Sequence, residues 1–290
     1  MRKFLTLLYI IMCMSAVNAS GATLAQVRWH DEAQDTIRVN ELLRRAMLIE
    51  APSTQARVGE IARMFIDTPY GAGTLEGQPE MLVVNLDSLD CTTLVENVAA
   101  IAITVGEGRN SWQDFLHNLE NIRYRGGSLD GYASRLHYIS SWIIDNDHRG
   151  NLKDVTDRFP EATYCVKSLD FMSRNRDKYP ALADDGELQR IKDYESIYRN
   201  HRFPYIKSGA VGHKVTQAAL QDGDIVAFVT KKEGLDVSHM GIIVKENGVA
   251  YLLHASPRSG KVEIDKRPLA EYLRKATGIL GIRVVRLMNP

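Results

Sequence analysis

The hydrophobic pattern of this chain changes from helical to strand-like near residue 222, and this order limits the folds open to it. From Asp222 onward, Gly, Asp, Asn and Ser turns separate short apolar or alternating runs, over residues 225–229, 240–244, 249–254, 262–264 and 280–287. Such runs predict β-strands, and Asn247-Gly248 between two of them predicts a tight hairpin. Helices first and an antiparallel sheet last favour an α+β fold over a doubly wound parallel sheet.

Most of the chain before residue 222 has a helical pattern. Apolar spacing and capping residues predict helices over residues 23–50, from Ser53 or Thr54 to Phe65, and from Cys91 to Val105 with Asp90 or Thr92 as the cap. Residues 68–74 are typical of a loop and residues 81–89 of a short strand. We divide the chain into a helix-rich part (20–105), an insertion (about 106–205) and a sheet (about 220–290) of one domain over residues 20–290. Within the insertion, helices are predicted over 111–123, 131–146 and 185–199, and a strand over 162–167.

The first nineteen residues have the pattern of a secretory signal peptide. A basic Arg2-Lys3 pair precedes an apolar run from Phe4 to Met14, and small residues allow cleavage after Ala19. The run is too short to cross a bilayer, and no later stretch is long and apolar enough. A buried N-terminal helix is the alternative. A lipoprotein is disfavoured because Met12, rather than a small residue, precedes Cys13. We therefore expect an exported protein, with the periplasm as its compartment.

Charge and cysteine content exclude several classes of protein. Lys+Arg and Asp+Glu both number 36, so no basic excess indicates nucleic-acid binding. Three cysteines are too few for a disulfide scaffold. Removal of residues 1–19 leaves Cys91 and Cys165, which either pair with each other or remain free. Cys165 lies in a predicted strand without small or acidic neighbours, and we interpret it as an inert small hydrophobe.

Cys91 and two histidines form the most reactive combination in the sequence. The helix predicted to begin at Cys91 presents unpaired N–H groups, which favour a thiolate and can bind an oxyanion. His239 begins one predicted strand and His254 ends the next, so the hairpin at Asn247-Gly248 brings both to the same end. A cysteine nucleophile needs a base, and the base needs an orienting group. Five other histidines lie in polar segments and are expected to be solvated: His30, His117, His148, His201 and His213.

These residues carry a resemblance to a known family. Asp90-Cys91-Thr92-Thr93-Leu94-Val95, Ser238-His239-Met240-Gly241-Ile242 and His254-Ala255-Ser256 resemble the three motifs of NlpC-type, papain-like cell-wall hydrolases. Pro69-Tyr70-Gly71-Ala72-Gly73 and Asp222-Gly223-Asp224 match further elements. The continuation Glu96-Asn97 and the segment 131–138 resemble the amidase-like branch, first catalogued as a domain of unknown function. Thr92-Thr93 departs from the usual Ser-Gly, and the insertion is longer than a minimal domain needs.

The resemblance implies a cysteine N-acetylmuramoyl-L-alanine amidase with a papain-like core and a helical insertion. Cys91 would be the nucleophile, His239 the base and His254 its orienting group. Substrate-binding residues would be Tyr70, Asp90, Thr92, Arg135, His137, Tyr138 and Ser238. For Arg135, His137 and Tyr138 the alternative is a structural ion pair and a packed aromatic face. We expect no cofactor or metal, small peptidoglycan fragments as partners, and a monomer.

Three other functions stay open at this point. A γ-D-glutamyl–diamino-acid endopeptidase is typical of the wider family. A non-catalytic muropeptide-binding protein would not need a nucleophile. A zinc amidase needs about three ligands around one ion, and the sequence has scattered histidines and no His-Glu-x-x-His motif.

Overall fold

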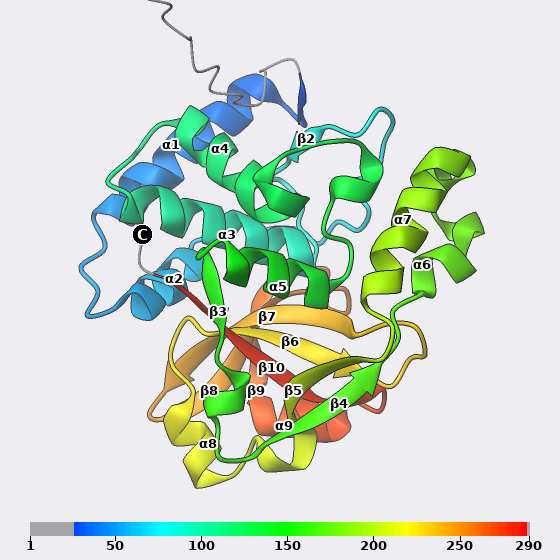
Figure 1. The fold of residues 1–290 in the computed structure, drawn as a ribbon. Helices are drawn as coiled ribbons and strands as arrows, with labels where there is room; N and C mark the ends of the chain where they lie inside the picture. The colour runs from blue at the N-terminus through cyan, green and yellow to red at the C-terminus, as the bar shows by residue number, and fades with distance from the viewer. Residues whose placement is uncertain (1–25, 289–290) are drawn as a thin grey trace, which may run out of the picture.

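The computed structural model describes residues 26–288, which form a helical layer packed on an antiparallel sheet (Figure 1). The sheet has eight strands in the order β4-β5-β10-β6-β7-β8-β9, with β3 paired to β10. All of its pairings are antiparallel. The expected α+β class is therefore confirmed. No helix within the described part of the chain is long and apolar enough to span a membrane.

The N-terminal helices begin at capping residues that the sequence supplies. Ser53 caps α2 (Thr54–Arg63), and Asp90 caps α3 (Cys91–Gly106). Asp31 caps α1 (Glu32–Met47), and Ser111 caps α4 (Trp112–Arg123). Because a capping side chain bonds the free N–H groups of the first turn, each fixes where its helix starts. A small parallel pair, β1 (Val27–Trp29) and β2 (Leu82–Val84), lies beside them. The remaining helices are α5 (Ile139–His148), α6 (Phe171–Arg174), α7 (Asp185–Ile197), α8 (Lys214–Ala219) and α9 (Leu269–Lys275).

The C-terminal strands form the meander that the turn pattern predicts, with one exception. Strands β6 (Ile225–Thr230), β7 (Val237–Glu246), β8 (Val249–Ser256) and β9 (Lys261–Pro268) follow one another in space. The last strand, β10 (Ile279–Leu287), does not pair with β9. It pairs with β6, at the opposite edge of this four-stranded meander. The other strands are β3 (Leu152–Asp154), β4 (Ala162–Lys167) and β5 (His201–Lys207), which extend the sheet beyond β10.

Both faces of the sheet are covered, so its strands carry two apolar cores. Alternate residues of β6 to β8 and β10 pack against α1 to α5 on one face, as Ile225, Met240 and Leu253 do. The intervening residues pack against α9 and against Val211 and Leu220 on either side of α8, as Val226, Ile243 and Leu252 do. Figure 1 shows α1 to α5 above the sheet and α8 and α9 below it. The period-2 alternation of a strand explains this division.

Several predicted elements differ from the structure. The helix predicted over residues 131–146 begins only at Ile139, because Gly131 has a positive φ of 72° and a short 3-10 turn, Tyr132–Ser134, follows it. The helix predicted over 23–50 is strand β1 followed by α1. The insertion is not purely helical, since β3, β4 and β5 join the sheet from it. Strand β5 and helix α9 were not predicted. The signal peptide expected over residues 1–19 lies outside the described residues.

Candidate active site

Cys91 is the first residue of α3, and the cap before it fixes its position. The Asp90 carboxylate accepts hydrogen bonds from the backbone N–H groups of Thr92 (3.0 Å) and Thr93 (2.8 Å). The Thr93 hydroxyl in turn accepts from the Asp90 N–H at 2.9 Å, which completes a capping box. Helix α3 packs against β7, where the backbone N–H of Met240 bonds the Cys91 sulfur. Cys91 therefore lies next to the strand residue that follows His239.

His239 and His254 form a direct imidazole pair, as the hairpin count predicts. His239 Nε2 and His254 Nδ1 lie 2.7 Å apart, close enough to share one proton. The rings meet edge to face, and the His254 side chain is buried. Gly241 permits this approach, because a Cβ there would stand 2.7 Å from the Leu253 carbonyl oxygen and 3.2 Å from the His254 Cβ. The pair leaves His239 Nδ1 as the nitrogen available for proton transfer.

Two tyrosines, Tyr70 and Tyr272, lie within electrostatic range of the Cys91 thiol. Burial raises the pKa of Tyr70, and the charges of Cys91 and Asp90 raise it further. Burial and Asp265 raise the pKa of Tyr272, with a smaller contribution from Cys91. Tyr272 also contacts the ring of His254 at a centroid distance of 5.7 Å. Within residues 26–288 no hydrogen bond or ion pair joins the thiol to either imidazole.

The electrostatics correct one sequence-based expectation. Burial, and then the Asp90 charge, raise the pKa of the Cys91 thiol to about 11, against smaller lowering by Met240 and Thr92. The sequence-based expectation of a lowered pKa therefore does not hold, because burial first and the charge of the capping carboxylate second outweigh the lowering contributions. Burial and the neighbouring His254 lower the pKa of His239 to about 3. At neutral pH the resting site holds a neutral thiol and neutral imidazoles.

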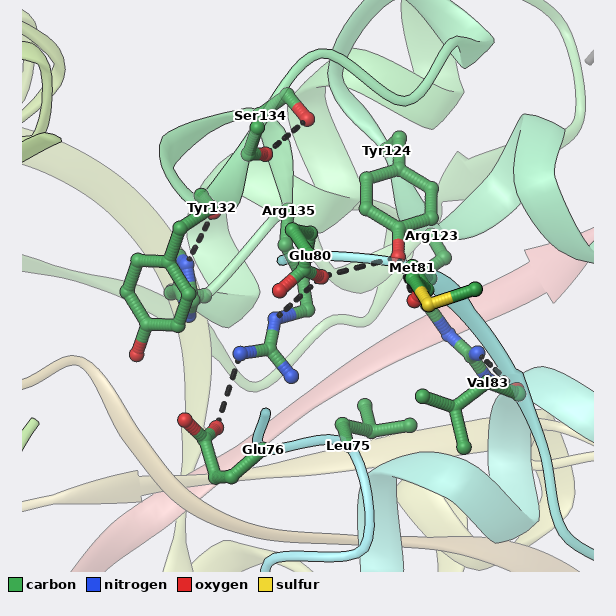
Figure 2. Close-up of polar contacts among 12 residues, drawn as sticks. Leu75, Glu76, Glu80, Met81, Val83, Arg123, Tyr124, Tyr132, Ser134 and Arg135 are labelled. Carbon is green, nitrogen blue, oxygen red and sulfur yellow. Dashed lines mark hydrogen bonds and ion pairs between the residues drawn. The ribbon is translucent and has the colours of Figure 1, made fainter. Parts of the chain in front are cut away.

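Arg135 lies in a second polar cluster, formed with Glu76 and Glu80 (Figure 2). Its Nη2 is 2.9 Å from a Glu76 oxygen, and its Nε is 3.4 Å from a Glu80 oxygen. The Arg135 and Glu80 side chains are 6% and 2% exposed, whereas that of Glu76 is 43% exposed. Glu80 also accepts a hydrogen bond from the Tyr124 hydroxyl at 3.0 Å. The guanidinium is thus held by one buried and one outward carboxylate.

His137 and Tyr138 take structural partners beside this cluster. The His137 ring packs on Tyr132 at a centroid distance of 4.5 Å, and its Nε2 is 2.9 Å from the Tyr132 carbonyl oxygen. The Tyr138 hydroxyl donates to Glu195 at 2.7 Å and accepts from the Met172 N–H. Burial and the Arg135 charge keep the pKa of His137 well below its usual range. Among residues 26–288 no hydrogen bond, ion pair or ring contact joins Arg135, His137 or Tyr138 to the Cys91 and histidine site.

Comparison with known proteins places the chain in a family. Residues 60–279 match the family described as AmiA-like, N-acetylmuramoyl-L-alanine amidase-like. The chain belongs to this amidase-like family. A crystal structure of an N-acetylmuramoyl-L-alanine amidase from Bacteroides uniformis is 38% identical to it, with a TM-score of 0.73, over 81% of this chain and 98% of that one.

Two further solved structures are similar to this member of the amidase-like family. A protein from Bacteroides fragilis, described as a putative xylanase, is 39% identical with a TM-score of 0.72, over 78% of this chain and 98% of that one. A protein from Legionella pneumophila is 23% identical with a TM-score of 0.69, over 89% of this chain and 95% of that one, and its likeness concerns the fold alone. No curated protein sequence matches the chain.

The other residues predicted for the site have varied surroundings in this amidase-like chain. Tyr70 borders the thiol, and the Thr92 hydroxyl is 4.0 Å from the Cys91 sulfur. The oxygen Oδ1 of Asp90 is committed to the helix cap, and Ser238 is exposed at the start of β7. Both Cys91 and Cys165 are free, so no disulfide joins them. Among the described residues no group of three or more His, Cys, Asp or Glu side chains could hold a metal ion.

Sequence reasoning missed the partners that surround the predicted residues. Glu76 and Glu80 lie in the segment before β2, and nothing in their spacing relates them to Arg135, some 55 to 59 residues later. Tyr272 lies on the unpredicted helix α9. Asp265 could have been found, because Val262, Ile264 and the residues between them alternate along β9 and place Glu263 and Asp265 on the face of His254.

Proposed function

We propose that this chain is a cysteine amidase of peptidoglycan fragments, which cleaves the amide between the muramic acid lactyl group and L-alanine. The observation that carries this proposal is the placement of Cys91 at the start of α3, next to β7, whose His239 pairs with His254 of β8, in a member of the amidase-like family. Nucleophile, base and orienting group are the parts that an acyl-transfer enzyme needs. The papain-like, NlpC-type assignment of the core is part of this proposal.

The neutral resting state determines the first chemical step. As the Cys91 sulfur bonds the amide carbonyl carbon, His239 Nδ1 takes the thiol proton, and His254 stabilises the imidazolium through the 2.7 Å contact. The oxyanion accepts hydrogen bonds from the Cys91 N–H and the Tyr70 hydroxyl. His239 then gives the proton to the alanine nitrogen as the C–N bond breaks. This leaves a thioester on Cys91 and a free peptide.

Hydrolysis of the thioester completes the cycle with the same residues. His239 takes a proton from a water molecule whose oxygen bonds the thioester carbon. The S–C bond breaks, the lactyl carboxylate is released, and the proton returns to the Cys91 sulfur. No metal ion is part of this sequence. Export to the periplasm, supported by the pattern of residues 1–19, would place the enzyme beside its substrate.

In this proposal Arg135 binds a carboxylate of the substrate in place of the Glu76 carboxylate. Glu76 is the outward partner of the guanidinium, and a carboxylate of the stem peptide would replace it. Glu80 stays in place because its side chain is only 2% exposed. A planar guanidinium binds such a carboxylate in a bidentate geometry.

Digestion of defined muropeptides tests the reaction directly. Mass analysis should find free stem peptide and the intact sugar with the wild-type protein, and neither with Cys91→Ala. Cys165→Ala is the matched control, because it removes the other free thiol and should keep full turnover. Cleavage within the stem peptide would support the endopeptidase instead, and unchanged hydrolysis by Cys91→Ala would overturn the proposal. Muropeptide binding without any hydrolysis would support a binding protein.

A further inference from the structure

The proposed reaction uses Nδ1 of His254 but gives no role to Nε2, the second nitrogen of this ring. His254 is 3% exposed, and its Nδ1 faces His239. Its Nε2 is buried and has no hydrogen-bond partner within residues 26–288. The ring lines a pocket of about 250 Å³ whose other walls include Glu263, Asp265, Arg267 and Tyr272. Since buried polar groups are nearly always paired, this nitrogen needs an explanation.

Two carboxylates lie on the same side of the sheet as this ring. Glu263 is paired with His254 across strands β8 and β9, and Asp265 follows two residues later on the same face. Arg267 clamps Asp265 through its Nε (2.9 Å) and Nη2 (2.7 Å), and its backbone N–H adds a third bond at 2.9 Å. The Asp265 carboxylate is thus rigidly placed, with its charge beside the buried imidazole.

The proton shared by the two histidines depends on the tautomer of His254. When His239 becomes an imidazolium, its Nε2–H must donate to His254 Nδ1, so Nδ1 must be unprotonated. A neutral His254 then carries its proton on Nε2, the nitrogen on the side of the pocket. We infer that Asp265 is a positioning residue, whose fixed charge holds His254 in this tautomer and so orients the pair. This inference rests on the proposed catalytic role of His239.

The surrounding charges agree with this role. Burial lowers the pKa of His254, while Asp265 and then Glu263 oppose that lowering, and Arg267 adds to it. Asp265 is therefore the strongest nearby charge that favours a proton on this ring. The charged and titratable groups around His254 are His239 on β7, Glu263, Asp265 and Arg267 on β9, Tyr272 and Lys275 on α9, and Arg258 in the turn after β8.

Nuclear magnetic resonance of nitrogen-labelled histidine can read the tautomer without any turnover. In a Cys91→Ala background, with the His254 signals assigned through His254→Asn, we expect His254 to be protonated on Nε2. Asp265→Asn should shift a measurable fraction of the proton to Nδ1. In the enzyme with its thiol intact, the same substitution should lower kcat by roughly tenfold with KM unchanged, the scale typical of lost carboxylate–histidine support. Glu271→Gln is the matched control, because Glu271 pairs with Lys275 on α9.

The outcomes separate this inference from the proposed function. An unchanged His254 tautomer in Asp265→Asn, or full kcat, would overturn the role of Asp265 while leaving Cys91 as nucleophile. Full hydrolysis by Cys91→Ala would overturn the proposed function instead. If Asp265→Asn fails to fold, the double variant Asp265→Asn, Arg267→Gln keeps a neutral hydrogen-bonded pair. The double variant should show the same tautomer shift, since Asp265 has the larger effect on His254.

Discussion

The half-buried Cys91 site and the largely buried Arg135 cluster are both polar, but they are stabilised in opposite ways. At Cys91 the thiol and the two imidazoles are neutral, and the closest polar contact is the 2.7 Å bond between the rings. Around Arg135, opposite charges face each other at 2.9 and 3.4 Å. In the first region burial keeps protons on the sulfur and off the rings. In the second, the ion pairs hold charge in place.

From this difference we infer that the Cys91 site transfers protons, whereas the Arg135 cluster stabilises the fold. A neutral thiol and imidazole can exchange a proton when a substrate arrives, because neither is locked in a strong ion pair. Arg123, at the end of α4, and Arg135, in the chain after α4, instead hold the segment before α3, as Figure 2 shows. Within that cluster only Glu76 is substantially exposed. The comparison predicts large activity losses in the first region and mainly stability losses in the second.

Removal of the base should have the largest effect on activity. We expect His239→Ala to lower kcat/KM by about 10² to 10⁴-fold, the usual contribution of general acid–base catalysis. The melting temperature should change little, because His239 is only half-buried near the start of β7. Steady-state hydrolysis of a defined muropeptide measures this effect. His117→Ala on the exposed face of α4 is the control and should retain full activity. A loss below tenfold for His239→Ala would contradict its role as base.

Removal of Arg123 should have the largest effect on stability. Its Nε is 2.6 Å from Glu96, and the two side chains are 2% and 4% exposed. Breaking such a pair leaves a buried charge unpaired, so Arg123→Ala should lower the free energy of unfolding by about 3–5 kcal/mol. Urea unfolding gives the value. The double variant Arg123→Met, Glu96→Gln should regain part of it, and a cost under about 1 kcal/mol for Arg123→Ala would show that the pair is dispensable.

The pH dependence of alkylation should distinguish a neutral thiol from a resting ion pair. Because the pKa of Cys91 is raised to about 11, the thiolate fraction should rise about tenfold for each pH unit between pH 6 and 10. Iodoacetamide labelling in a Cys165→Ala background isolates this thiol. The label rate should therefore be slow at pH 7 and increase steadily. A fast rate that is constant from pH 5 to 8 would indicate a thiolate–imidazolium pair instead.

The sequence predicts the framework of the catalytic site better than its environment. Caps such as Asp90 and turns such as Asn247-Gly248 act on neighbouring residues, so the start of α3 and the pairing of His239 with His254 follow from local rules. The raised pKa of Cys91 depends on burial by distant segments, which no local pattern records. The partners of Arg135 likewise come from the distant residues 76 and 80. Strand β10 pairs with β6, although β7, β8 and β9 lie between them in the chain. Contacts of this kind depend on how the layers pack.

The smallest expected effect concerns the outward carboxylate of the Arg135 cluster. If a substrate carboxylate replaces Glu76, then Glu76→Gln removes its competitor, and KM should fall by roughly twofold to fivefold with kcat unchanged. The melting temperature should hardly move, because an ion pair with one exposed partner contributes about 0–1 kcal/mol. Glu233→Gln, which removes the exposed partner of Arg174, is the matched control and should leave KM unchanged. Arg135→Ala should raise KM, whereas a lower melting temperature with unchanged KM would make the cluster purely structural. The opposite signs expected for Glu76→Gln and Arg135→Ala are decisive, because loss of a structural pair would move both variants in the same direction.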